Sequence, residues 1–171
     1  MDVALAAGMK AALVSFAGPG KTPAELERAV AAGIVINMES ELEMRRIAEI
    51  ARRTGRHPKV AIRVNPDFEL KTSGMKMAGG PKQFGVDAER VPDMLRELTA
   101  LPLEFWGFHI YSGSQNLRPE LLVASPKKTA AVAIELARHA PSPVRLLNLG
   151  GGFGIPYFPG DTPLDLAPIG A

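Results

Sequence analysis

Several residues suited to chemistry follow directly after short β-branched runs. The clearest group is Gly150-Gly151-Gly152, which comes after the apolar run from Val144 to Leu149. Successive glycines can turn their backbone N–H groups toward one point, and such a concavity binds phosphate. A plain glycine-rich turn is the structural alternative. The run lacks both the third glycine of a dinucleotide fingerprint and the Gly-Lys-Ser/Thr ending of a P-loop, so a nucleotide site is disfavoured.

Two polar rings precede a small polar turn, and they belong to an expected strand from Phe105 to Ser112. His109 and Tyr111 should point into the protein interior, where a ring could stack on a flat cofactor and Ser114 could reach its phosphate. A satisfied core histidine is the simpler alternative. Strand alternation gives two faces: Gly107, His109 and Tyr111 on one, and Trp106, Phe108 and Ile110 packed under helices on the other.

Arg63 is the single charge inside the apolar strand Val60 to Val64. Burying a guanidinium without an anion is costly, so Arg63 should meet either a carboxylate or a phosphate. The sequence leaves a structural ion pair and a cofactor contact equally open.

These residues must be positioned by alternating strands and helices. Five runs predict strands, and four amphipathic segments between them predict helices. Thr22-Pro23-Ala24-Glu25 is a capping box, and Pro126 should kink or split the fourth helix. The expected strands are 12–16, 34–37, 60–65, 105–112 and 144–149, and the expected helices start at Thr22, Ser40, Asp87 and Pro119 and end near Gly33, Gly55, Thr99 and His139.

Alternating βα units predict an α/β fold with a parallel sheet. Five parallel strands could form a small open sheet, or five consecutive units of a (β/α)8 TIM barrel. In both folds, ligands gather at the carboxyl ends of the strands. The stretch from Pro66 to Gly85 is long for a plain connection, which suggests a functional or mobile loop. No closing helix is expected after the last strand.

Composition excludes several classes of protein. The chain has 171 residues, a formal charge of +2 and no cysteine, so neither a nucleic-acid partner, nor a disulfide framework, nor a thiolate metal site is expected. No signal peptide or membrane span is visible, and a cytoplasmic location is expected. The arginine-rich stretch from Glu41 to Arg56 should form the solvated face of one helix.

Five ordered motifs together resemble one enzyme family, the fold-type III pyridoxal-phosphate (PLP) decarboxylases of ornithine and diaminopimelate, whose barrel is shared with alanine racemase. Two short segments are most similar in sequence to a bacterial subgroup associated with exosortase systems: Gly74-Met75-Lys76-Met77 and the segment from Gly154 to Asp161. The motifs are Phe16 to Lys21, Ile62 to Pro66, Lys82 to Gly85, Gly107 to Gln115 and Asn148 to Gly154.

The resemblance implies PLP as cofactor. It implies that Gly150, Gly151 and Gly152 bind the phosphate with Ser114, and that Arg63 lies on the active-site face. The family's stacking histidine corresponds to Tyr111 here, with His109 two residues earlier. No segment matches the family's Tyr-Ala-x-Lys motif, so the Schiff-base lysine is expected to be absent, and Lys21 is not a substitute.

By the same resemblance, residues 1–171 form an incomplete PLP-binding barrel domain without the family's C-terminal β-domain. The implied function is decarboxylation of a small basic or diamino acid, with this chain inactive alone and the full-length form a homodimer without membrane or nucleic-acid partners. A non-catalytic PLP-binding or regulatory module is the alternative, and a small nucleotide-using α/β enzyme is a third. Open sheet edges should make the isolated chain marginally stable.

Overall fold

The computed structural model describes residues 1–67, 75–76 and 83–170, and its centre is a parallel sheet. The strands follow one another in the order β1-β2-β3-β6-β8, and β5 (Val86–Asp87) pairs with the end of β3. Neighbouring strands therefore follow chain order, as they do in the wall of a (β/α)8 barrel. The main strands are β1 (Ser15–Phe16), β2 (Val35–Met38), β3 (Lys59–Asn65), β6 (Glu104–Ile110) and β8 (Leu146–Asn148).

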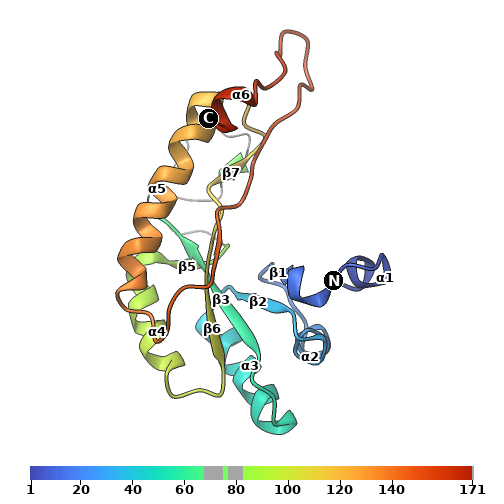
Figure 1. The fold of residues 1–171 in the computed structure, drawn as a ribbon, viewed down its shortest axis with the longest axis vertical. Helices are drawn as coiled ribbons and strands as arrows, with labels where there is room; N and C mark the ends of the chain where they lie inside the picture. Colours follow the sequence, from blue (N-terminus) through green and yellow to red (C-terminus); the bar gives the residue numbers. More distant parts are fainter. Residues whose placement is uncertain (68–74, 77–82, 171) are drawn as a thin grey trace.

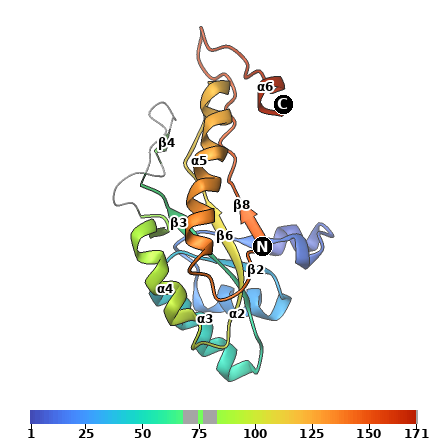
Figure 2. The ribbon, with the colours of Figure 1, turned by 60° about the vertical axis from the view of Figure 1, so that its left-hand side comes forward.

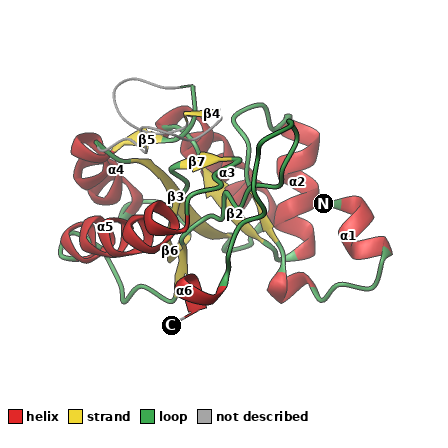
Figure 3. Cartoon of the chain, turned by 90° about the horizontal axis from the view of Figure 1, so that it is seen from above, coloured by secondary structure: helices red, strands yellow, loops and turns green. Residues whose placement is uncertain are grey.

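Helices connect these strands and cover the outer face of the curved sheet (Figures 1 and 3). The long helix α5 runs beside β6, and the last segment of the chain returns to it at α6 (Figure 2). The resulting α/β half-barrel confirms the predicted fold class. The helices are α1 (Asp2–Ala6), α2 (Pro23–Ala32), α3 (Glu41–Thr54), α4 (Val91–Leu98), α5 (Pro119–Ala137) and α6 (Ala167–Gly170), with 3-10 turns at Ala11–Leu13 and Ala88–Arg90.

Helix boundaries follow the capping signals. The Thr22 hydroxyl accepts from the Glu25 N–H, and the Glu25 carboxylate accepts from the Thr22 N–H, which completes the predicted capping box of α2. Ser40 caps α3 by accepting from the Glu43 N–H at 3.2 Å. Both helices end at a left-handed glycine, Gly33 and Gly55, as the sequence predicts.

The main core lies between the sheet and these helices. Strand side chains on the outer face are apolar, and they pack against the apolar stripe of each helix. Burial of this layer supplies the main stabilisation of the half-barrel. Its fully buried members include Leu26, Ile36, Met38, Met44, Ile47, Val60, Ile62, Met94, Leu95, Phe108 and Ile110.

A bulge in β6 corrects the predicted faces of that strand. The register passes from Val60 opposite Phe105 directly to Ala61 opposite Gly107, so Trp106 is left out of the ladder. Phe105 consequently joins Phe108 in the outer core, with ring centroids 5.4 Å apart. Trp106 instead lines a cavity of about 530 Å³ between the two end strands β1 and β8.

Four further expectations are corrected. Helix α5 runs continuously through Pro126, so the proline does not split it. The one-turn helix α6 follows the last strand, where no helix was expected. Glu43 is buried rather than solvated, whereas Arg45 and Arg53 of the same helix are exposed as expected and pair with Glu97 and Glu27 of other helices. The end strands are also shorter than predicted.

Most of the long segment from Pro66 to Gly85 lies outside the described residues, including Lys82 of its motif. Its described part contains β4 (Met75–Lys76), which pairs antiparallel with β7 (Gly113–Ser114). Within the described ranges, no helix has the length and apolar character that crossing a bilayer requires.

Candidate functional site

A row of polar residues crosses the sheet near the carboxyl ends of its strands. Arg63 of β3 is the register partner of His109 of β6, and His109 is the register partner of Asn148 of β8. In-register residues of parallel strands point to the same face. The fold therefore brings together two of the predicted site residues, Arg63 and His109, with Asn148 as the third member of the row.

Arg63 meets a carboxylate, which confirms one of the two predicted anions. Its Nη1 donates to both oxygens of Glu39, at 2.9 and 3.2 Å. Both side chains are buried, and the ring of Phe84 lies under the guanidinium at 4.8 Å from its centroid. The charge of Arg63 is thus compensated inside the barrel wall.

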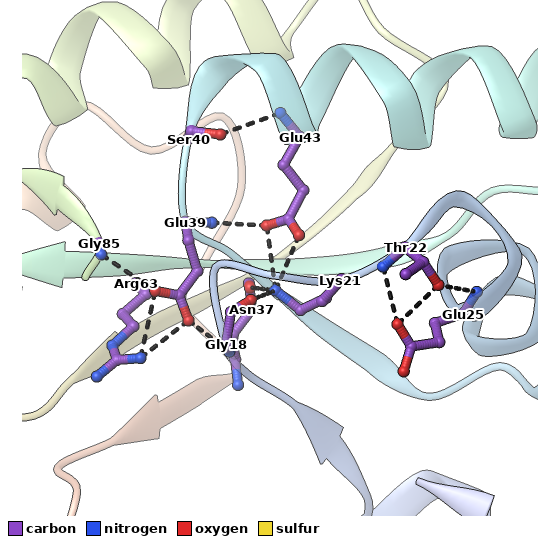
Figure 4. A network of polar contacts seen from close by, with 10 residues as sticks. All are labelled: Gly18, Lys21, Thr22, Glu25, Asn37, Glu39, Ser40, Glu43, Arg63 and Gly85. Carbon is purple, nitrogen blue, oxygen red and sulfur yellow. Dashed lines mark hydrogen bonds and ion pairs between the residues drawn. The ribbon is translucent and has the colours of Figure 1, made fainter. Parts of the chain in front are cut away.

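Glu39 also forms hydrogen bonds to the backbone of two loops (Figure 4). Its carboxylate accepts from the backbone N–H of Gly18 at 2.5 Å and from that of Gly85 at 3.1 Å. Gly18 follows β1 and Gly85 precedes β5, so one side chain joins the ends of separate βα units. Four donor contacts satisfy this buried carboxylate.

A second buried carboxylate, that of Glu43, lies in the first turn of α3. Glu43 accepts from the Nζ of Lys21 at 2.9 and 3.1 Å and from the Glu39 N–H at 2.8 Å. The Lys21 ammonium also donates to the carbonyl oxygens of Gly18 and Asn37, at 2.6 and 2.9 Å. Burial raises the pKa of Glu43 above its ordinary value, although the adjacent ammonium opposes this. Lys21 is therefore a structural cation held by three partners.

His109 is a neutral imidazole. Burial, together with the nearby cations Arg63 and Lys21, lowers its pKa from 6.5 to about 4, and the Glu39 carboxylate opposes part of this shift. Its Nδ1 is buried and has no hydrogen-bond partner among the described residues. A neutral ring at this position can accept or donate a proton but does not contribute a fixed charge.

The glycine run packs against the segment that follows β6. Asn116 donates its N–H to the Gly152 carbonyl and accepts from the Gly154 N–H, both at 2.9 Å. The Gly150 N–H donates to Oδ1 of Asn148 at 2.9 Å, which ties the run to the polar row. Within the described part of the chain, the N–H groups of Gly151 and Gly152 donate no hydrogen bond.

Close approach explains why glycine is required in this run. A Cβ on Gly150 would lie 2.4 Å from the Tyr111 ring, and a Cβ on Gly152 would lie 2.2 Å from the Gly113 carbonyl oxygen and 3.6 Å from the Ser114 Cα. Both glycines also have positive φ, 76° and 91°. The structure thus places the predicted residues Tyr111 and Ser114 beside the glycines, and two glycine amides there have no acceptor among the described residues.

Sequence reasoning missed Glu39, Glu43 and Asn148 as members of this site. Glu39 immediately follows β2, at the carboxyl end where ligands gather, and the need of Arg63 for an anion pointed to such a residue. Glu43 was missed because its charged neighbours on α3 predicted a solvated helix face. Asn148 precedes the glycine run, where a side chain that caps a turn is common.

A cavity of about 500 Å³ lies between the end of β3 and helices α4 and α5, and none of the predicted site residues lines it. Asn148 of the polar row lines the cavity of about 530 Å³ between β1 and β8. The site is therefore defined by its polar contacts and not by cavity size.

Residues 1–170 match the family model described as the pyridoxal-dependent decarboxylase, pyridoxal binding domain. The chain belongs to the pyridoxal-dependent decarboxylase family. Family membership implies pyridoxal phosphate as the cofactor, and it confirms the resemblance given by the five motifs.

Relatives support the same family. An L-glutamyl-BtrI acyl-carrier-protein decarboxylase of Niallia circulans is 38% identical, over 98% of this chain and 40% of its own length. The diaminopimelate decarboxylase of Aquifex aeolicus is 35% identical, over 95% of this chain and 40% of its own length.

The fold agrees with solved structures of the family. Diaminopimelate decarboxylase of Helicobacter pylori complexed with L-lysine superposes with a TM-score of 0.86 at 29% identity, over 98% of this chain and 43% of that one. The chain thus spans about two fifths of the length of the relatives that it matches.

Proposed function

We propose that this chain provides the phosphate cradle and part of the barrel wall of a PLP-dependent amino-acid decarboxylase of the diaminopimelate and ornithine type. The observation that carries the proposal is the glycine run, in which the N–H groups of Gly151 and Gly152 donate no hydrogen bond within the described residues. Tyr111 lies beside Gly150, and Ser114 lies beside Gly152. Free amides held in a fixed turn are a site for phosphate oxygens.

The residues present fit the cofactor. A side chain at Gly150 or Gly152 would clash with Tyr111 or Gly113, so the run is shaped by close backbone approach and not by chance composition. In the proposed cradle, Gly150, Gly151 and Gly152 face the phosphate with the Ser114 hydroxyl, and Tyr111 offers its ring to the flat cofactor.

The side chains of the polar row would line the part of the site that faces the barrel interior. Arg63 would contribute a positive charge already compensated by Glu39, and His109 a neutral imidazole. When bound, pyridoxal phosphate accepts the electron pair released as the α-carboxylate leaves as carbon dioxide. The protein residues orient the reactants and keep water from the buried row.

We further propose that no lysine of this chain attaches the cofactor, so that the chain alone is inactive. Lys21 supports this, because its ammonium is buried and bonded to Glu43, Gly18 and Asn37. The remaining barrel strands and a C-terminal β-domain would then come from outside residues 1–171, in a cytoplasmic homodimer.

The proposed substrate is a basic or diamino acid. Relatives named diaminopimelate decarboxylase, 31 to 36% identical, favour this class. The Niallia circulans relative acts on an L-glutamyl carrier protein, which makes a carrier-bound amino acid the competing class in a substrate assay.

The proposal is tested by titrating the purified chain with PLP, followed by absorbance, with inorganic phosphate as competitor. Gly151→Ala is the informative variant, because its Cβ would meet only the Phe153 ring, at 3.8 Å, and would add a methyl group next to the proposed phosphate position without disturbing the fold. Gly20→Ala is the matched control, since nothing lies within 4 Å of its Cβ. Steric exclusion of the phosphate by the added methyl group should weaken binding roughly tenfold in Gly151→Ala alone.

Borohydride reduction and mass spectrometry complete the test. We expect phosphate-competable binding and no single trapped lysine. Binding that phosphate does not displace, or that is absent, would overturn the cradle. Stoichiometric reduction onto one lysine would show that this chain attaches the cofactor itself.

A non-catalytic PLP-binding or regulatory module is the second candidate, and the fully bonded Lys21 favours it as well. The gene separates the two. An in-frame upstream stretch that encodes Tyr-Ala-x-Lys favours the enzyme, and a promoter and start codon at Met1 favour the short module.

A further inference from the structure

Glu39 connects three separate parts of the chain through one buried carboxylate. Its side chain is 2% exposed and receives hydrogen bonds from Gly18, Gly85 and Arg63. Gly18 lies in the loop between β1 and α2, Arg63 lies in β3, and Gly85 lies in the segment before β5. No other side chain in the described ranges bonds to all three of these regions.

We propose that Glu39 is a positioning residue of the proposed pyridoxal site. It orients the Arg63 guanidinium and fixes the loops after β1 and before β5 around it. This inference rests on the proposed function, because Arg63 is assigned to the site there.

The bonding pattern requires an acceptor on both carboxylate oxygens. Oε1 accepts from Gly18 at 2.5 Å and from Arg63 at 2.9 Å, and Oε2 accepts from Gly85 at 3.1 Å and from Arg63 at 3.2 Å. All of these partners are donors. A glutamine would place its own NH₂ against half of them, so no orientation of the amide can replace the carboxylate.

Glu39 is itself held in place from both directions. Its backbone N–H donates to Glu43, and Glu43 holds Lys21, which donates to the Gly18 carbonyl at 2.6 Å. Gly18 is therefore fixed at its N–H by Glu39 and at its carbonyl by Lys21 (Figure 4). The two carboxylates form one network that sets the loop from Gly18 to Lys21 over the strand ends.

The network leaves two donor atoms of the Arg63 guanidinium, Nη2 and Nε, available to bind a ligand. Only Nη1 is bonded to Glu39, and within the described residues Nη2 and Nε donate no hydrogen bond. The side chain is 7% exposed, so these donors are aimed by the protein and are not free to swing into solvent. With its net charge compensated, Arg63 can present them to an anionic group in the barrel mouth without isolating a buried charge.

The experiment compares Glu39→Gln, Arg63→Met and the double variant with a control, Glu97→Gln. Glu97 also pairs with an arginine, Arg45, but that pair is exposed and distant from the strand ends. PLP affinity is measured for each with phosphate as competitor. Amide hydrogen exchange at Gly18 and Gly85 is measured in the same proteins.

If Glu39 acts through Arg63, the two single changes each weaken PLP binding roughly tenfold and the double variant is no weaker than the worse single one. Exchange at Gly18 and Gly85 speeds up in Glu39→Gln and stays unchanged in Glu97→Gln. Unchanged affinity in Glu39→Gln, or effects that add in the double variant, would overturn the inference.

If Glu39→Gln fails to fold, the double variant removes the stranded charge of Arg63, and Glu39→Asp keeps the carboxylate with a shorter reach. Both variants then carry the comparison of affinity and exchange. If the unaltered chain shows no phosphate-competable binding, the proposed function fails, and the exchange rates at Gly18 and Gly85 alone decide whether Glu39 fixes these loops.

Discussion

His109 and Arg63 are register partners on adjacent strands, so an imidazole and a guanidinium share one layer of the barrel interior. Burial and the arginine together keep that imidazole neutral down to a pH of about 4. Glu39 compensates the guanidinium from the opposite side. The polar row can therefore be buried without an uncompensated charge.

This arrangement predicts acid sensitivity. The unfolded chain takes up a proton at His109 near its ordinary pKa of 6.5, whereas the folded chain does so only near 4. Between these values the unfolded state binds more protons, so the free energy of unfolding should fall as the pH drops from about 6.5 to about 4. The full contribution is about 3 kcal/mol, from about 1.4 kcal/mol per pKa unit.

Chemical denaturation at several pH values measures it, with His109→Gln as the comparison. The variant should lose the His109 part of the slope, while other titrating groups, Glu43 among them, affect both proteins alike. Equal slopes in the two proteins would show that the imidazole is not held neutral.

The buried ion pair between Lys21 and Glu43 predicts that substitutions at these two residues have strongly non-additive effects on the free energy of unfolding. The two side chains are 1% and 8% exposed, so removal of either partner leaves a buried charge. Lys21→Met and Glu43→Gln should each lower the free energy of unfolding by about 3–5 kcal/mol. The double variant should cost clearly less than the sum, and urea denaturation of the four proteins measures the difference. Additive costs would mean that the pair is solvated in solution.

The close contact between Gly107 and β8 predicts that a side chain at this position would disrupt the sheet. A Cβ at this position would lie 1.8 Å from the backbone oxygen of Leu146, at a φ of 151°. Gly107→Ala should therefore push β6 and β8 apart and destabilise the chain by about 3 kcal/mol or more. Gly20→Ala, whose Cβ meets nothing within 4 Å, should change the thermal midpoint little. A tolerated alanine at Gly107 would show that β8 does not pair with β6 in this register.

Local signals in the sequence determined the helices and the family. The Thr22–Glu25 box and the left-handed Gly33 involve only neighbouring residues, so their side chains alone set where α2 begins and ends. Alternation of strands and helices gave the parallel α/β fold. Motif order gave the family, and the glycine run gave a phosphate site that stays a prediction.

Only the tertiary structure decided which residues share the site. Glu39 and Arg63 are 24 positions apart, and their contact depends on the register between β2 and β3, which no local pattern encodes. The bulge that moves Trp106 out of the outer core likewise arises from packing across three strands. Burial then turned Lys21 and Glu43, ordinary surface residue types, into an interior ion pair, because a residue's solvent exposure is set by the whole fold.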